Sequence, residues 1–158
     1  MVGNEGLARK WGDERAYFVQ TAYVTAFDAH KLSVLAFGNL AIYAAQKYRK
    51  ILTAMITEVR SKVDGYTRCT LNNAKVLEAE EIPFTYELHN AALSKSNVAD
   101  RSAKLAMRLS STPGTASTQS SSTRQALAAL GVLSLYKTMD GKNAFRIDWE
   151  SPIIQAIA

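Results

Sequence analysis

The stretch that decides the fold is SSSTRQALAALGVLSLYKTMDGKNAFRIDW, residues 120–149. A serine at its start can cap a helix, and apolar residues then recur at helical spacing until Gly131, which can end the helix in a left-handed conformation. Residues 132–136 alternate as a strand, and Asp140-Gly141 predicts a tight turn before a second alternating run at 144–149. The sequence therefore predicts a helix followed by a β-hairpin.

The predicted helix has two faces of different chemistry. Its inward stripe is Thr123, Ala126, Leu127 and Leu130, and its outward face is Ser121, Arg124, Gln125 and Ala128. A planar guanidinium such as that of Arg124 can pair with guanine through two hydrogen bonds, and the amide of Gln125 suits adenine. The alternative without a binding role is a structural helix whose polar residues only contact solvent.

The order of helix, glycine, apolar pair, strand, basic turn and strand resembles the second half of a winged helix-turn-helix domain. The resemblance covers residues 86–149 and implies a nucleic-acid-binding protein. It assigns the helix that ends at Gly131 as the recognition helix, residues 140–143 as the wing, and residues 97–110 as the first helix of the motif. The family joins its two motif helices by a tight turn, whereas about ten residues separate them here, so either the recognition helix begins earlier, near Ser117, or the motif is elaborated.

Charge is unevenly distributed along the chain. The whole sequence has a net charge of +5, and residues 94–146 hold eight basic residues against Asp100 and Asp140 alone. A surface of one sign favours a polyanionic partner, although dispersed lysines and arginines also solubilise helices. The candidate nucleic-acid-binding residues are Ser121, Arg124, Gln125, Lys104, Arg108, Lys137, Lys142 and Arg146.

A run rich in serine and threonine precedes the helix. Ten of the fourteen residues from Ser110 to Thr123 are Ser or Thr, with Pro113-Gly114 among them. This composition predicts a surface loop. The functional alternative is a segment that holds phosphates with hydroxyl and backbone N–H donors.

The first part of the chain reads as helix up to about residue 62. Asp13 and Asp28 are candidate N-caps, Gly38-Asn39 interrupts the second helix, and Asp64-Gly65 ends it. These helices are apolar on more than one stripe, so we expect a homo-oligomer that associates through residues 13–62.

The predicted organisation is a helical association region at 1–65, a connector at 66–84, a winged-helix-like region at 85–150 and a docked tail at 151–158. Strand-type residues at 66–71 and the Asn72-Asn73 turn signal suggest a short hairpin in the connector. In the tail, Ser151 can cap a short helix with Pro152 at its first position, and its isoleucines predict docking.

The fold class expected from the sequence is mainly α with a C-terminal β-hairpin. Neither a catalytic motif nor a metal-ligand cluster is visible, since His30, His89 and Cys69 are widely separated, so we expect no enzyme activity, no metal and no cofactor. No apolar run is long enough for a membrane span, and one cysteine without a signal-peptide pattern suggests a cytoplasmic or virion location.

Three functions remain open at this stage. The first is a non-catalytic nucleic-acid-binding regulator of transcription or replication, of phage, plasmid or virus type, for which DNA is favoured over RNA as the partner. The second is a helical viral coat or nucleoprotein subunit. The third is a protein-interaction adaptor.

Overall fold

The computed structural model describes residues 21–94 and 113–158. The protein is mainly helical, with a small three-stranded antiparallel sheet in its C-terminal part, which confirms the predicted fold class. In chain order the elements are α2 (Thr21–Ala29), α3 (Val34–Gly38), α4 (Ile42–Thr57), the 3-10 turn η1 (Arg60–Lys62), α5 (Gly65–Ala79), β1 (Phe84–Thr85), α6 (Tyr86–Leu93), α7 (Pro113–Ala129), β2 (Leu133–Lys137), β3 (Asn143–Ile147) and α8 (Pro152–Ile157).

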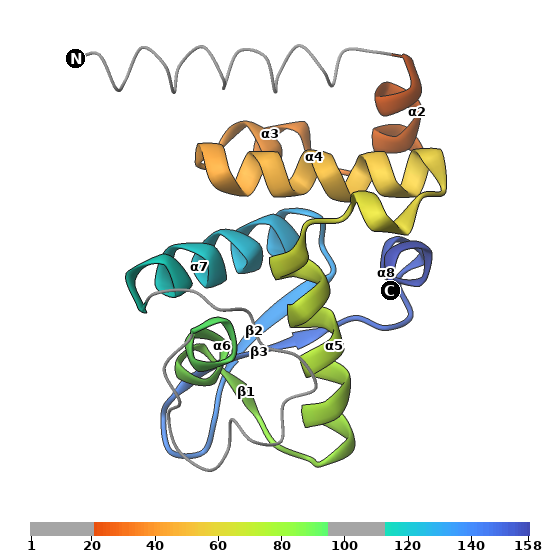
Figure 1. Ribbon diagram of the computed structural model, residues 1–158. Helices are drawn as coiled ribbons and strands as arrows, with labels where there is room; N and C mark the ends of the chain where they lie inside the picture. The colour runs from red at the N-terminus through yellow and green to blue at the C-terminus, as the bar shows by residue number, and fades with distance from the viewer. Residues whose placement is uncertain (1–20, 95–112) are drawn as a thin grey trace, which may run out of the picture.

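Helix α7 is the centre of the arrangement. It packs against α4 on one side and against α6 and α5 on others (Figure 1). The sheet has the order β1-β3-β2, and both pairings are antiparallel, with Phe145 of β3 opposite Phe84 of β1 and Leu135 of β2. Helix α8 returns to pack against α4. The N-terminal helices and the C-terminal hairpin are thereby held in one structure.

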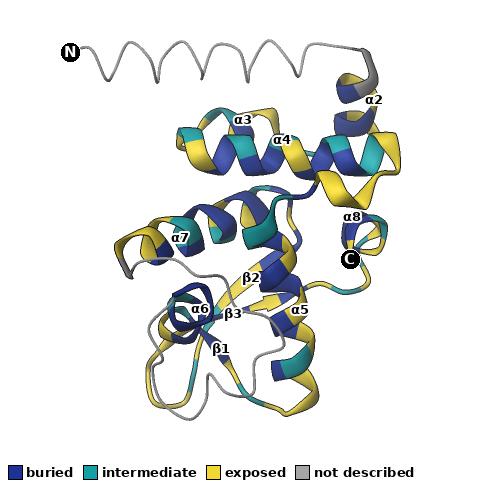
Figure 2. Cartoon of the chain, in the orientation of Figure 1, coloured by how far each residue is buried: buried dark blue, intermediate teal, exposed yellow. Residues whose placement is uncertain are grey.

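A large hydrophobic core connects these elements, and Cys69, Leu93 and Ala116 form a second, smaller cluster. The members of the large core run from Tyr23 in α2 to Ile157 in α8, and the buried residues of α4, α5 and α7 face one another (Figure 2). Tyr48, Leu127 and Phe145 are all at most 2% exposed. Complete burial of one such side chain stabilises a fold by about 1.5–3 kcal/mol, so this shared core is the main force that holds the two halves together.

An aromatic cluster fixes the first two helices on α4. Phe27 of α2 and Phe37 of α3 both contact Tyr48 of α4, with ring centroids 6.1 and 5.1 Å away. The two phenylalanines also meet edge to face at 6.3 Å. Offset and edge-to-face contacts of this kind are favoured by the charge distribution of the rings. They explain why the short α2 and α3 can hold a defined place.

Three local predictions are confirmed in the C-terminal part: the glycine that follows α7, the hairpin turn and the capped helix in the tail. Gly131 follows α7 with φ +74°, and Gly141 in the hairpin turn has φ +81°, both in the left-handed region that favours glycine. In α8, the Ser151 hydroxyl accepts a hydrogen bond from the Ile153 N–H. All three isoleucines of this helix are buried, so the tail is docked on the body of the protein.

Two predictions about the N-terminal helices need correction. Asp28 is not an N-cap, because it lies in the last turn of α2. Asp64-Gly65 does not end a helix either: α4 ends at Thr57 and is followed by Glu58, whose φ is +58°. The Asp64 carboxylate instead caps α5 by accepting from the Thr67 N–H. The predicted interruption at Gly38-Asn39 is confirmed, since α3 ends at Gly38.

The predicted connector hairpin at 66–84 is wrong. Residues 66–71 and Asn72-Asn73 are helical and belong to α5. Their polar side chains find partners inside the helix, because the Thr70 hydroxyl donates to the Tyr66 carbonyl and the Asn73 amide donates to the Cys69 sulfur. Burial of this helix face outweighs the weak helix propensity of threonine and asparagine.

The predicted Ser/Thr-rich loop is wrong for its described residues. Helix α7 begins at Pro113, a residue well suited to a first helical position. Hydroxyls in the run form hydrogen bonds within α7 or to the neighbouring helix α6. Ser122 donates to the Gln119 carbonyl, and Ser120 donates to the Asn90 side chain of α6. The sequence alternative of an early helix start is therefore supported. Residues 110–112, and the first motif helix predicted at 97–110, lie outside the described residues.

Candidate nucleic-acid interface

Helix α7 has one exposed stripe between its two helical neighbours. On the α4 side, Gln119 accepts a hydrogen bond from Lys47, and on the α6 side, Ser120 contacts Asn90. The predicted inward stripe, Thr123, Ala126, Leu127 and Leu130, is buried as expected. The residues left facing outward are small or polar and carry no charge. Ser117, Thr118, Gln125 and Ala128 are exposed, and Ser121 among them is half-buried. Two predicted site residues, Ser121 and Gln125, thus share this stripe, and the Gln125 amide donates to the Ser121 hydroxyl at 3.1 Å.

Arg124 lies at the edge of this stripe and is half-buried. Its guanidinium carbon is 3.8 Å from the centre of the Tyr86 ring on α6. One terminal nitrogen donates to Nδ1 of His89, 2.9 Å away. The sequence predicted that Arg124 faces outward freely, whereas the structure gives it two partners within the protein.

His89 is the residue that sequence reasoning missed. It is fully buried and packs against the rings of Phe84 and Phe145, whose centroids lie 5.2 and 5.1 Å from its own. Because Nδ1 accepts from Arg124, the ring proton lies on Nε2, which donates to the Thr70 hydroxyl at 2.8 Å. Burial, and next the positive charge of Arg124, lower the pKa of His89 well below its usual range. The spacing of Tyr86 and His89, three residues apart on one helix face, is the sequence signal that could have indicated this cluster.

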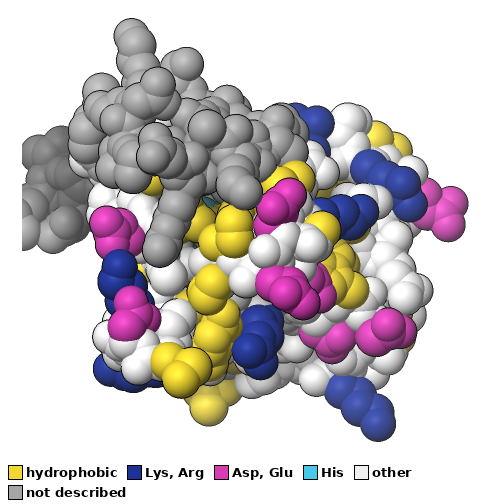
Figure 3. Space-filling view, turned by 90° about the horizontal axis from the view of Figure 1, so that it is seen from below, with side chains coloured by type: hydrophobic (Ala, Val, Ile, Leu, Met, Phe, Trp, Pro, Cys, Tyr) yellow, Lys and Arg dark blue, Asp and Glu magenta, His cyan; other side chains and the backbone are white. Residues whose placement is uncertain are grey.

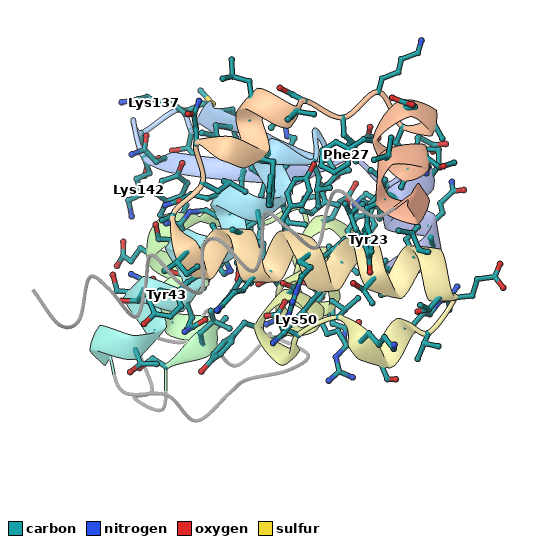
Figure 4. All side chains as sticks on the ribbon, turned by 90° about the horizontal axis from the view of Figure 1, so that it is seen from above. Tyr23, Phe27, Tyr43, Lys50, Lys137 and Lys142 are labelled. Carbon is teal, nitrogen blue, oxygen red and sulfur yellow. The ribbon has the colours of Figure 1, made fainter. Side chains whose placement is uncertain are left out.

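The hairpin places two lysines on the side of the molecule at which α7 begins. Lys137 and Lys142, at opposite ends of the turn, lie at the left of Figure 4, together with Tyr43 at the start of α4. Both lysines are exposed. Lys142 also pairs with Glu87 across 3.7 Å, and both side chains of this pair are well exposed.

Arg146 lies elsewhere. Its position in β3 puts it on the sheet face opposite to Phe145, where it stacks on the Tyr136 ring at 4.2 Å. There it lines a cleft of about 280 Å³ together with Glu78 and Glu81. From below, basic and acidic side chains alternate over the surface (Figure 3). The structure therefore does not bring Arg146 together with Lys137 and Lys142.

The remaining predicted residues, Lys104 and Arg108, lie outside the described residues. They belong to the segment 95–112, which connects α6 to the start of α7 and holds four basic residues against one acidic residue. Connectivity therefore brings a segment with net charge +3 to the beginning of α7.

A buried lysine joins three helices behind the stripe. Lys47 of α4 is only 7% exposed; its ammonium donates to Gln119 of α7 and lies 5.3 Å from the centre of the Tyr66 ring of α5. Burial lowers the pKa of Lys47, and the charge of Asp64 opposes this effect. Lys47 therefore connects α4, α5 and α7 in the interior and is not part of the exposed surface.

Other classes of site have no support in the described residues. Across 21–94 and 113–158, no group of three or more histidine, cysteine, aspartate or glutamate side chains is placed to hold a metal ion. Within the same part of the chain, no helix combines the length and hydropathy of a membrane span.

Comparison of the chain with protein families, with curated proteins and with solved structures gave no match. Its function must therefore be inferred from its own residues and their arrangement.

Proposed function

We propose that the protein binds nucleic acid through the exposed stripe of α7, the hairpin lysines and the basic segment 95–112. The observations that carry this proposal are an uncharged hydrogen-bonding face on α7 and two exposed lysines at the turn of the β2–β3 hairpin that follows this helix. Hydroxyl and amide groups on such a helix can reach base edges and phosphate oxygens, and lysines can neutralise phosphates.

The order of elements supports the same proposal. Helix α5, strand β1, helices α6 and α7 and the β2–β3 hairpin follow one another around a sheet of order β1-β3-β2. This order resembles that of winged helix-turn-helix domains, and in the proposed assignment α7 is the recognition helix and the β2–β3 turn is the wing. In this assignment α6, rather than residues 97–110, precedes the recognition helix in the described part of the chain.

The electrostatics of the hairpin are compatible with phosphate contacts. Lys142 and Glu87 form an exposed ion pair, and such pairs contribute only about 0–1 kcal/mol. A phosphate can therefore replace Glu87 at little cost. We place Arg146 outside the interface, because it lies on the opposite sheet face beside two glutamates.

The first experiment is a titration of the full chain with mixed-sequence DNA and RNA duplexes at several salt concentrations. Each phosphate contact adds about 0.9 to the slope of log affinity against log salt. Lys142→Ala and Lys137→Ala should each reduce this slope by about one unit. The matched control is Lys50→Ala, because Lys50 is an exposed lysine placed farther along α4, away from the hairpin (Figure 4).

The outcome of this titration separates the alternatives. An affinity that does not change with salt, or equal slopes for all three lysine variants, would contradict the proposed surface. Tighter binding to DNA than to RNA is the expected result. Absence of binding to either nucleic acid would favour a protein-interaction adaptor.

We also propose that the protein associates with itself through α3. Val34 and Leu35 are 70% and 75% exposed on this helix, which is unusual for neighbouring large apolar residues. A second copy of the chain is the proposed partner, and sedimentation velocity at increasing concentration tests it. A discrete dimer fits a regulator, whereas open-ended assembly fits a coat or nucleoprotein subunit. A monomer at high concentration would contradict this association.

A further inference from the structure

The Arg124 guanidinium is held by two contacts from α6, and one of these is in turn fixed by α5. Tyr86 of α6 supports one face of its plane, and His89 accepts from one terminal nitrogen. His89 is itself fixed by Thr70 of α5, whose hydroxyl accepts from Nε2 and donates to the Tyr66 carbonyl at 2.8 Å. Each donor in this chain meets an acceptor, so the tautomer of His89 and the position of the guanidinium are set together.

These contacts use only part of the hydrogen-bonding capacity of Arg124. A guanidinium has five N–H donors in a rigid planar fork, and one of them is directed at His89. Arg124 is half-buried rather than enclosed, and its neighbours Ser121 and Gln125 belong to the exposed stripe of α7. The solvent-facing edge of the fork is therefore presented beside that stripe in a fixed orientation.

We infer that Tyr86, His89 and Thr70 are positioning residues that hold Arg124 ready to donate two hydrogen bonds to a pair of acceptor atoms on the bound nucleic acid. This inference rests on the proposed function. The acceptor pair has one chemistry and two sources: the O6 and N7 atoms of guanine, or two oxygens of a phosphate. An arginine that is fixed in advance loses less side-chain entropy on binding than a free one.

Neutral His89 is a requirement of this arrangement. A protonated ring would turn Nδ1 into a donor and would oppose the guanidinium. The charged group that faces His89 is Arg124 from α7, while α5 contributes Thr70 and strands β1 and β3 contribute Phe84 and Phe145. The phenol of Tyr86 lies against the guanidinium rather than against a second charge.

The test is a double-mutant cycle on affinity for a mixed-sequence DNA duplex. Arg124→Ala should weaken binding about tenfold, within the range of a two-bond contact. Thr70→Val removes the acceptor of His89 and should weaken binding several-fold, whereas Thr70→Ser, which keeps the hydroxyl, should restore it. In an Arg124→Ala background, Thr70→Val should have no further effect on affinity.

Two arms distinguish the source of the acceptors. If Arg124 contacts guanine, replacing guanine by 7-deazaguanine weakens binding of the wild-type protein and not of Arg124→Ala. If it contacts phosphate, 7-deazaguanine has no effect and Arg124→Ala lowers the salt slope by about one unit. Either pattern supports the inference.

Three outcomes would overturn it while leaving the proposed function intact. The first is salt-dependent binding that Arg124→Ala does not weaken. The second is an equal effect of Thr70→Val with and without Arg124, which would make Thr70 a structural residue only. The third needs no variant: nitrogen NMR of the wild-type protein at neutral pH that finds the proton of His89 on Nδ1. Failure of the proposed function itself would appear as no salt-dependent binding by the wild-type protein.

Discussion

Protonation of His89 should make the stability of the protein depend on pH in a defined direction. The folded state lowers the pKa of this buried imidazole below the ordinary value of 6.5, so the unfolded chain binds the proton more readily. Stability from this group is therefore fully present above pH 6.5 and is lost as the pH falls below it. If folded His89 stays neutral, the loss between pH 7.5 and pH 5.5 is about 1.4 kcal/mol.

Urea unfolding followed by circular dichroism at pH 7.5, 6.5 and 5.5 measures this loss. His89→Asn keeps an acceptor near the position of Nδ1 but cannot titrate, so its free energy of unfolding should fall by about 1.4 kcal/mol less than that of the wild type over the same range. Carboxylates titrate in both proteins and cancel in the comparison. The matched control is His30→Asn, which removes the other histidine of the chain. Equal pH dependence of the wild type and His89→Asn would refute the reasoning.

Four further substitutions test packing, association and backbone conformation. Leu52→Asp places a carboxylate at a fully buried position and should prevent folding. Leu35 is 75% exposed, so Leu35→Asp should change the unfolding free energy by less than about 0.5 kcal/mol. The same substitution should reduce self-association in sedimentation. Ile154→Ala should cost about 2–5 kcal/mol in urea unfolding, and a cost near zero would mean that α8 is not docked. Gly131→Ala should lower the free energy of unfolding by about 1 kcal/mol, because φ at this position is +74°. A steric clash is not the reason, since a Cβ there would meet no neighbour within 4 Å. An unchanged melting temperature would contradict the left-handed conformation.

Local rules were sufficient for the C-terminal part of the chain. The end of α7 at Gly131, the Asp140-Gly141 turn and the Ser151 cap depend on neighbours in sequence, and all three are present. The Ser/Thr run and residues 66–73 were misread because their helices depend on tertiary contacts. Hydroxyls of α7 bond within their helix and to Asn90 of α6, and α5 buries Thr67, Thr70 and Asn73.

The candidate site was only partly visible in the sequence. Ser121 and Gln125 could be placed from helical periodicity, because both lie on the face opposite the apolar stripe. The partners of Arg124 could not, since Tyr86 and His89 are 38 and 35 positions away from it in the chain. The separation of Arg146 from the hairpin lysines depends on strand register, because a one-residue shift would move Arg146 to the other face of the sheet.

The most direct test of nucleic-acid binding through α7 and the hairpin is chemical-shift mapping. The ¹⁵N-labelled full chain is titrated with a short mixed-sequence DNA duplex, and the backbone amide signals are followed. The account predicts that the largest shifts fall on the exposed stripe of α7, around Ser121 and Gln125, and on the hairpin between Lys137 and Lys142. Shifts centred on Lys50 and the outer face of α4, or no shifts at all, would contradict it.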